Sequence, residues 1–424
     1  MMFDVAIIGA GPAGLLAAKT AAQRGLKVAL VEKRSDVSRI TRACCQQLVM
    51  DEGYAGDTVS VKEGGIFFER GGFGAAYAGP TFNVTKKYYI SPGGRRICFA
   101  HPDGRPLAVQ FDKGRLLQGL WGSCAGAGVE LMPGTTAWNG SDDGEKVTVQ
   151  LTSRGRRSAI EARKLVIADG VNSRMAEALN MNQGRTHFVT TQCLIYLLEG
   201  IDDPEPQAMK SFMGNVYQSR APIILYPYFN DPTRARMCIA RNKSQLTGEV
   251  FAYARDKAAL APYLKNARIV KTTGCGLKAC SSMMQPWRGN ALAIGDAAAF
   301  VEVETQGALM CGFYAASAVL MELAGQAGFA QYTRWWQQAF EFNGPDALRV
   351  AQGYALVPAY SDDELDYLFG LVEGEALPGS YSQYHTPKYM WDAILAHREQ
   401  ISSDRPELLK KIESSMQLTL NDTL

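Results

Sequence analysis

The sequence predicts an α/β protein with three parts: a nucleotide-binding domain on a parallel sheet, a second domain on an antiparallel sheet, and a helical C-terminal region. The first part follows from an apolar strand at Phe3–Ile8, a helical pattern at Pro12–Gly25 and a second strand at Lys27–Glu32. A strand–helix–strand unit of about thirty residues implies parallel strands, because parallel neighbours need a crossover connection. Alternating apolar and polar residues between about 185 and 280 predict the antiparallel sheet. Residues 326–424 are rich in helix formers and charge.

The other elements are predicted from the 3.6-residue period of helices and the two-residue period of strands, and from the Gly, Pro and Asn residues that mark turns between them. They are strands at Lys87–Ile90, Arg96–Ala100, Val129–Met132, Val147–Leu151, Ala159–Ile167 and Asn290–Gly295, and helices at Phe111–Ala127 and Gly307–Ala324. This order predicts a discontinuous division of the chain. The nucleotide-binding domain takes residues 1–75, 105–182 and 275–325, the second domain takes 76–104 and 183–274, and the C-terminal helical region takes 326–424.

The composition is that of a globular protein. Of the 424 residues, 47% are hydrophobic and 20% are charged, which are ordinary values for packed domains. A formal net charge of +2 leaves no positive excess for a nucleic acid, so no such partner is expected. No apolar run approaches the ~20 residues of a membrane span. We therefore expect a cytoplasmic protein without an integral span; a peripheral membrane contact and the oligomeric state stay open.

Cysteine and histidine spacing gives no metal site. The four histidines lack H-x-x-x-H spacing, and the cysteines lack the C-x-x-C spacing of zinc and redox motifs. In a cytosolic protein we expect reduced, mostly buried thiols. The nine cysteines are at positions 44, 45, 98, 124, 193, 238, 275, 280 and 311.

The first motif is the glycine-rich turn Gly9-Ala10-Gly11-Pro12-Ala13-Gly14 between the first strand and helix. Its first glycine permits the tight turn, the second lets a pyrophosphate approach the backbone, and the third lets the helix pack on the strand. Glu32, followed by Lys33, ends the second strand, where a carboxylate binds ribose hydroxyls. The acid disfavours a 2′-phosphate, so NADP is not expected at this site.

Two later segments each follow a predicted strand. Ala168-Asp169-Gly170-Val171-Asn172-Ser173-Arg174 places an acid and a turn glycine at a strand end. Gly295-Asp296-Ala297-Ala298-Ala299 precedes Gly307-Ala308, which is predicted to open the long helix. An aspartate at this place can accept a hydrogen bond from a ribityl hydroxyl, and amides at a helix start can face an electron-rich carbonyl.

The ordered set of three motifs resembles the FAD superfamily of p-hydroxybenzoate hydroxylase and the geranylgeranyl reductases, over about residues 1–325. The resemblance implies a Rossmann-like FAD-binding domain of the glutathione reductase type, with adenosine near Glu32 and ribitol near Asp296. It also implies that the flavin ring lies under the sheet of the second domain. Asp169 corresponds to an acid that hydroxylases link to both FAD and NAD(P)H. Lys113 stands where the family's D-R-x-x-L segment usually has arginine, so no FAD contact is assigned there.

The segment Arg42-Ala43-Cys44-Cys45 favours the geranylgeranyl reductase branch. It falls where those reductases carry an R-C-x-E-G-like segment whose cysteine lies near the flavin, which places Arg42 and Ala43 beside FAD. A thiol there can donate a proton while reduced flavin delivers hydride to a carbon–carbon double bond. A reference pKa near ~8.5 leaves such a thiol mostly protonated at neutral pH. Cys44 and Cys45 are the candidate catalytic residues, with buried packing thiols as the alternative.

Two segments depart from the family. Hydroxylases commonly continue the third motif with His and two prolines, and reductases with a proline, but Phe300–Gln306 has neither. Glu302 and Glu304 then lie near the ring edge, which we interpret as a solvated rim in preference to an acid–base pair. The substrate strand of the reductases, Y-x-W-x-F-P, is replaced by Leu-Tyr-Pro-Tyr-Phe from residue 225. Tyr226 and Tyr228 share a face at period two and are candidate pocket residues, with core packing as the alternative.

The favoured function is an FAD-dependent reductase that reduces a carbon–carbon double bond of a largely apolar or aromatic small molecule. The electron donor, NAD(P)H or a protein, is not identified, because no second G-x-G-x-x-G follows. One alternative is a flavin monooxygenase that hydroxylates an aromatic substrate. Another is a non-redox cyclase or isomerase, as the related lycopene cyclases suggest. A flavin-binding module without catalysis is a fourth hypothesis.

Overall fold

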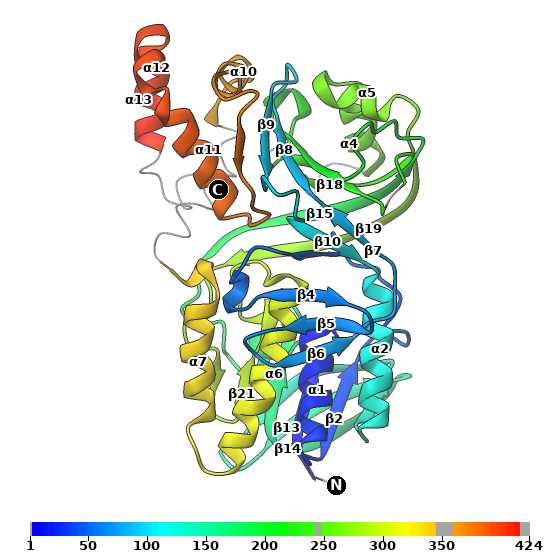
Figure 1. Ribbon diagram of the computed structural model, residues 1–424. Coiled ribbons are helices and arrows are strands. Elements are labelled where there is room, and N and C mark those ends of the chain that lie inside the picture. The colour runs from blue at the N-terminus through cyan, green and yellow to red at the C-terminus, as the bar shows by residue number, and fades with distance from the viewer. Residues whose placement is uncertain (1, 220, 230, 242–246, 345–358, 416–424) are drawn as a thin grey trace.

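The protein has the predicted α/β architecture. The structure, a computed structural model, describes residues 2–219, 221–229, 231–241, 247–344 and 359–415. Among these residues the strands form four sheets, two large and two small. Figure 1 shows the sheet of the nucleotide-binding half below and the large antiparallel sheet above, with the C-terminal helices beside the latter.

The lower sheet contains the predicted strand–helix–strand unit. Its strands are β1 (Met2–Ile8), β2 (Val28–Glu32), β11 (Glu130–Pro133), β12 (Thr135–Asp142), β13 (Val147–Ser153), β14 (Arg156–Ile167), β20 (Trp287–Arg288) and β21 (Ala291–Ala293). The parallel part has the order β11-β2-β1-β14-β21. β2 is buried throughout, which explains its continuous apolar sequence. β13 and β12 extend antiparallel from β14.

Helices cover this sheet and pack closely on one another. They are α1 (Pro12–Gln23), α2 (Lys113–Gly126), α3 (Arg174–Ala178), α6 (Glu304–Leu323) and α7 (Gly328–Ala339), with short 3₁₀ turns η1 (Tyr54–Gly56), η4 (Gly295–Ala297) and η5 (Glu341–Asn343). α1 packs against both α2 and α6. A Cβ at Gly312 of α6 would lie 2.3 Å from the carbonyl oxygen of Ala13, so glycine permits the close approach of α6 to α1.

Helix α6 differs from its prediction at its start. It begins at Glu304, three residues before Gly307, so Gly307 lies inside the helix and does not open it. Its length and mean hydropathy of 1.2 would suit a membrane span, but 61% of that window is buried inside the protein. Because α6 is buried against α1 and α7, its apolar sequence is explained by packing in the core of the protein.

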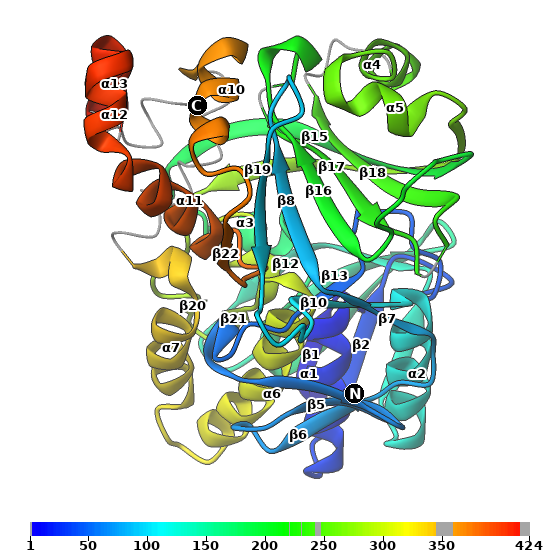
Figure 2. The same ribbon diagram turned by 45° about the horizontal axis from the view of Figure 1, so that its top comes forward.

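The upper sheet is the predicted sheet of the second domain. Its strands are β8 (Lys86–Ile90), β9 (Arg96–Ala100), β15 (His187–Glu199), β16 (Ala208–Phe212), β17 (Ile223–Pro227), β18 (Arg234–Arg241), β19 (Arg268–Cys280) and β22 (Ala376–Pro378). Most neighbours are antiparallel, but β16–β8 and β22–β9 are parallel. Leu194, Tyr196 and Leu198 of β15 pack with Phe251 and Leu264. Phe251 lies on α4 (Thr247–Ala254) and Leu264 on α5 (Ala261–Leu264) (Figure 2). The 3₁₀ turn η2 (Asn215–Tyr217) precedes α4, and η3 (Ala258–Leu260) lies between α4 and α5.

Period two therefore turns the intervening residues of β15 toward the other half of the molecule. Two small antiparallel sheets complete this region. One consists of β3 (Gln47–Val49), β10 (Ala108–Phe111) and β7 (Thr81–Val84), and the other of β4 (Val59–Lys62), β5 (Gly65–Phe68) and β6 (Phe73–Ala76).

The C-terminal region is helical, as predicted, but it also supplies β22 to the upper sheet. Its helices are α10 (Asp362–Leu371), α11 (His385–Ala396), α12 (Arg398–Asp404) and α13 (Pro406–Ser415). The buried Lys87 ammonium donates to the Tyr381 carbonyl at 3.2 Å and to Thr386 Oγ1 at 2.9 Å. Asp51 accepts from Ser380 and from the Tyr381 amide. These contacts attach the region to the sheet. The exact domain boundaries stay a prediction.

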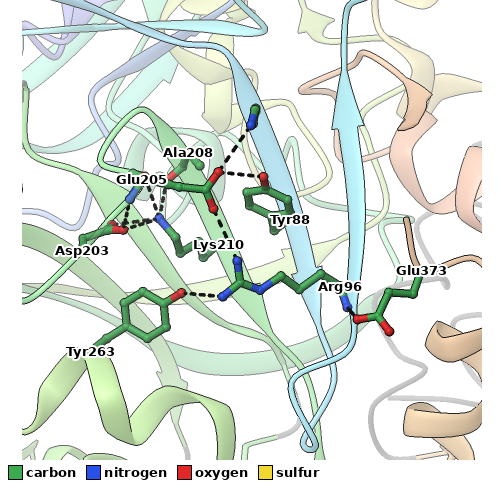
Figure 3. A network of polar contacts seen from close by, with 9 residues as sticks. Tyr88, Arg96, Asp203, Glu205, Ala208, Lys210, Tyr263 and Glu373 are labelled. Carbon is green, nitrogen blue, oxygen red and sulfur yellow. Dashed lines mark hydrogen bonds and ion pairs between the residues drawn. The ribbon is translucent and has the colours of Figure 1, made fainter. Parts of the chain in front are cut away.

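A buried ion pair stabilises the upper sheet. The Lys210 ammonium, fully buried on β16, lies 2.8 Å from both carboxylate oxygens of Asp203, and Glu205 accepts from Tyr88 and Arg96 beside it (Figure 3). We expect Asp203→Ala to lower the free energy of unfolding by about 3–5 kcal/mol, because it leaves a buried charge uncompensated. Urea denaturation measures the change.

The control for this pair is Glu373→Ala, which removes a carboxylate from exposed Arg95. A surface pair contributes at most about 1 kcal/mol. Equal losses for the two variants would contradict the assignment of Lys210 and Asp203 as the structural pair.

Candidate functional site

A cavity of about 540 Å³ lies between the two large sheets. Its wall includes the β1–α1 turn, the end of β2, the loop before β3, the start of α6, and strands β15, β17, β18 and β19. It brings together most residues predicted from the motifs: Gly9, Gly11, Pro12, Ala13, Glu32, Lys33, Arg42, Ala43, Cys44, Cys45, Asp169, Tyr226, Gly295, Asp296 and Ala308. Gly14, Gly307 and Tyr228 do not line this cavity.

The three glycines of the first motif have different surroundings. A Cβ at Gly9, where φ is +104°, would lie 2.3 Å from the Ala168 carbonyl oxygen, and one at Gly14 would lie 1.9 Å from the Gly9 carbonyl oxygen. These two glycines let the turn and α1 pack on the sheet. Around Gly11, no atom of the described residues lies within 4 Å of an added Cβ. Gly11 therefore leaves room on the cavity side, next to the free amides at the start of α1.

Glu32 lies at the other end of this turn as a buried carboxylate. It accepts hydrogen bonds from the Ala10 amide at 2.7 Å and from the Arg34 amide and Nε at 2.8 and 2.9 Å. Burial opposes ionisation, but the hydrogen bonds and charge of Arg34 outweigh it and hold the pKa of Glu32 below its usual range. Arg34 Nη2 also donates to this carboxylate, at 3.3 Å, so a ribose hydroxyl that binds Glu32 competes with Arg34 for its acceptor sites.

Arg42 connects the second and third motifs. Its guanidinium lies 3.9 Å from the Asp296 carboxylate, and a Cβ at Gly170 would meet it at 2.8 Å. Asp296 also accepts from the Val303 amide at 3.1 Å. Asp169 caps α3 through one oxygen, at 3.0 Å from the Arg174 amide. Its other oxygen is buried and has no hydrogen-bond partner among the described residues.

These features fit FAD. Gly11 and the amides that follow it would hold the pyrophosphate, Glu32 the adenosine ribose, and Asp296 and Asp169 the hydroxyls of the ribityl chain. The vacant acceptor on Asp169 and the space beside Gly11 are what such a ligand requires. Burial raises the pKa of Asp169, consistent with a carboxyl group that lacks its full set of donors.

Two thiols lie where the flavin ring is expected, and their environments differ. Cys44 Sγ is 3.4 Å from the Lys113 ammonium. A hydrogen bond from Cys45, with the charge of Lys113, holds the pKa of Cys44 well below its usual range despite burial. This direction favours the thiolate form of Cys44 over the protonated thiol that a proton donor needs. After the hydrogen bond from Cys45, the charge of Lys113, the departure from the family pattern, contributes to this shift.

Cys45 keeps its proton. Its hydrogen bond to the Cys44 thiolate, burial and the nearby Glu304 raise the pKa of the Cys45 thiol. Cys45 Sγ lies 4.0 Å from a carboxyl oxygen of Glu304. Of the two predicted catalytic cysteines, Cys45 is the one whose raised pKa favours the protonated thiol that a proton donor needs.

Glu302 and Glu304 line the cavity as a pair of carboxyl groups, with Glu302 exposed and Glu304 half-buried, as in the rim that we expected. Burial and the charges of Asp296 and Cys44 raise the pKa of Glu302 to about 7. Burial and Glu302 raise the pKa of Glu304 well above its usual range. Glu304 also has a φ of +58°, a left-handed conformation that costs a non-glycine residue about 1–3 kcal/mol. Such strain is typical of functional sites.

The upper sheet contributes thiols that sequence patterns did not single out. Cys193, Cys238 and Cys275 line the cavity with Ile195 and Tyr226, and the Sγ atoms of Cys193 and Cys238 are 3.4 Å apart. All nine cysteines are free and lie among the described residues. Period two along β15 could have identified Cys193 and Ile195 as residues of this wall, since both face away from the side of the sheet that the helices cover.

Tyr228 lies in a different place from Tyr226. β17 ends at Pro227, and Phe229 has a φ of +51°, so period two no longer applies beyond the strand. Tyr228 lines a second cavity of about 260 Å³. The two tyrosines line different cavities, so the shared pocket predicted for them is not observed.

Comparison with known proteins agrees with this site. The family model of pyridine nucleotide-disulphide oxidoreductases matches residues 3–199. A digeranylgeranylglycerophospholipid reductase of Methanocaldococcus jannaschii is 23% identical over 392 residues, covering 89% of this chain and 92% of that protein.

Two solved structures share the fold. A geranylgeranyl bacteriochlorophyll reductase-like protein of Thermoplasma acidophilum has a TM-score of 0.71 and 19% identity, with coverage of 98% and 99% of the two chains. The p-nitrophenol 4-monooxygenase of Pseudomonas putida has a TM-score of 0.61 and 13% identity, with coverage of 100% and 99%. By its motifs, cavity and fold, the chain is similar to the superfamily of FAD-dependent oxidoreductases that includes the geranylgeranyl reductases and p-hydroxybenzoate hydroxylase.

Proposed function

We propose that the protein is an FAD-dependent reductase that saturates a carbon–carbon double bond of a largely apolar small molecule. The observation that carries the proposal is the contact between Cys45 Sγ and a Glu304 carboxyl oxygen, 4.0 Å apart in the wall of the cavity beside the predicted flavin position, where the pKa values of both groups are raised. Reduction of an alkene adds a hydride to one carbon and a proton to the other. A thiol that keeps its proton at neutral pH, with a carboxylic acid behind it, supplies the second requirement.

The residues of the cavity have different roles in the proposed reaction. FAD, when bound, supplies the hydride chemistry. Cys45 donates the proton to the substrate carbon, and Glu304 returns a proton to Cys45. The Cys44 thiolate and Lys113 hold a fixed ion pair beside them, which keeps the Cys45 thiol hydrogen-bonded and oriented. Ile195 and Tyr226 give the substrate an apolar and aromatic wall.

The relatives support this choice, since the curated protein of Methanocaldococcus jannaschii is named a lipid reductase. The fold is shared with a monooxygenase, so oxygen chemistry is the main competing function. The experiment must separate the two.

The test starts from anaerobic holoprotein whose flavin is reduced with NADH, NADPH or dithionite. We expect addition of an isoprenoid alkene such as farnesol to reoxidise the flavin without oxygen and to give a product heavier by two hydrogens. Absorbance of the flavin and mass spectrometry of the product measure this. Reoxidation only by oxygen, with an oxygen atom inserted into the substrate, would contradict the reductase. The donor that reduces the flavin within seconds identifies the electron source.

A further inference from the structure

The second cavity, of about 260 Å³, adjoins the first at Cys44. Both cavities are lined by Ile40, Cys44 and Ile195. The remaining wall of the second comes from β17–β18, β19 and the start of α2, and includes Arg236, Tyr228 and Phe229. These three residues form the boundary between the two cavities.

Arg236 is a buried arginine without an anionic partner. Its side chain is 5% exposed, its Nη1 atom has no hydrogen-bond partner, and no ion pair involves it among the described residues. The other strand cations differ. Arg234, two residues earlier on β18, pairs with Glu199 and Asp231, and the buried Lys210 pairs with Asp203.

The arrangement around Arg236 keeps it charged and oriented. The guanidinium carbon lies 4.8 Å from the Tyr228 ring centre and 5.5 Å from that of Phe229. The Phe229 amide donates to Gln110 at 2.7 Å, and Gln110 donates to the Pro227 carbonyl, which fixes the turn that carries both rings. Burial lowers the pKa of Arg236, but a guanidinium stays protonated in proteins.

The net charge of this cavity is positive. Arg39 and Lys271 line it and are exposed at its outer side. Asp112 and Cys44 are the anionic groups in its wall, and both are already engaged. Asp112 caps α2 through the Arg115 amide and lies 3.8 Å from the Arg115 guanidinium, and Cys44 Sγ lies 3.4 Å from the Lys113 ammonium. An unpaired buried guanidinium with two further cations nearby is a site for an anion.

We propose that Arg236 and the second cavity bind the anionic headgroup of the substrate, a carboxylate or a phosphate monoester, whose unsaturated chain passes Cys44 into the main cavity. The inference rests on the proposed reductase for the identity of the chain, while the anion site itself rests on Arg236. Its ligand class is thus an amphiphile with a charged head and an apolar, unsaturated tail.

The experiment measures binding to oxidised holoprotein, without turnover, by the change in flavin absorbance. Two matched pairs of probes are titrated: oleate with oleyl alcohol, and farnesyl monophosphate with farnesol. We expect the anionic member of at least one pair to bind about 10- to 100-fold tighter, the range of a charge-assisted hydrogen bond. The pair that shows the preference identifies the headgroup as carboxylate or phosphate.

Variants locate the preference. Arg236→Met should reduce it to less than about twofold, Arg236→Lys should retain part of it, and the control Arg234→Met should keep all of it. The melting temperature of Arg236→Met should equal or exceed that of the parent, because an unpaired buried charge is removed. Anions that bind no tighter than alcohols, or a preference unchanged in Arg236→Met, would overturn the proposal. Anion preference without reduction of any double bond would instead contradict the reductase and leave the anion site in place.

Discussion

Replacing Gly11 with valine is expected to abolish FAD binding while the protein stays folded. Gly11 has an extended backbone, φ −78° and ψ −179°, which valine adopts without strain. No atom of the described residues lies within 4 Å of its added Cβ, so the branched side chain meets no protein. It fills the space through which the pyrophosphate would reach the amides of α1.

The expected loss is at least about 100-fold in FAD affinity, the equivalent of about 3 kcal/mol of overpacking against the ligand. Titration of the apoprotein with FAD, followed by quenching of flavin fluorescence, measures it. The melting temperature of the apoprotein should remain close to that of the parent.

Gly14→Val is the matched control on the same helix. Its Cβ would lie 1.9 Å from the Gly9 carbonyl oxygen, so this variant should lose stability even without FAD, because α1 must move away from the strand. If Gly11→Val purified with a full complement of FAD, the assignment of the first turn as the pyrophosphate site would be wrong.

These glycines show which parts of the site could be predicted from the sequence. Gly9, Gly11 and Glu32 belong to one local unit, in which the strand, the turn and the helix are adjacent in the chain. Spacing alone therefore carries their geometry. The large sheets were predictable for the same reason, since alternation along a strand records which face is buried.

The chemistry of the thiols depends on contacts that spacing does not record. Lys113 lies 69 residues from Cys44 in sequence but 3.4 Å from it in space, and its charge helps to lower the pKa of that thiol. Glu304 lies 259 residues from Cys45. Tyr226 and Tyr228 line different cavities although period two predicts one face for both, and the sequence pattern does not show that Phe229, directly after them, leaves the extended conformation.

The second large effect is expected at the acid pair. We expect Cys45→Ala to lower the rate of substrate reduction by about 10²- to 10⁴-fold, the usual contribution of a general acid, with little change in flavin reduction by the donor. Separate stopped-flow measurements of the two half-reactions distinguish these effects. Cys280→Ser, a thiol outside the cavity lining, is the control. Equal rates for Cys45→Ala and the parent would exclude Cys45 as the proton donor.

The pH dependence tests the role of Glu304 more sharply. A group whose pKa is raised holds its proton at neutral pH and loses it only as the pH rises through that raised value. The rate of substrate reduction should therefore be constant at neutral pH and fall on the alkaline side. In Glu304→Gln this alkaline fall should disappear or move to the pKa of Cys45, together with a lower plateau, because the amide cannot resupply a proton.

Glu302→Gln should move the alkaline fall in a definite direction. Glu302 has a pKa of about 7 and is ionised above that pH, where its negative charge disfavours ionisation of Glu304. Removing the charge lowers the pKa of Glu304, so the fall should begin at a lower pH than in the parent. A shift to higher pH would mean that Glu302 does not act on Glu304 as a like charge. An unchanged profile in both variants would leave Cys45 to draw its proton from water and would remove the carboxyl pair from the mechanism.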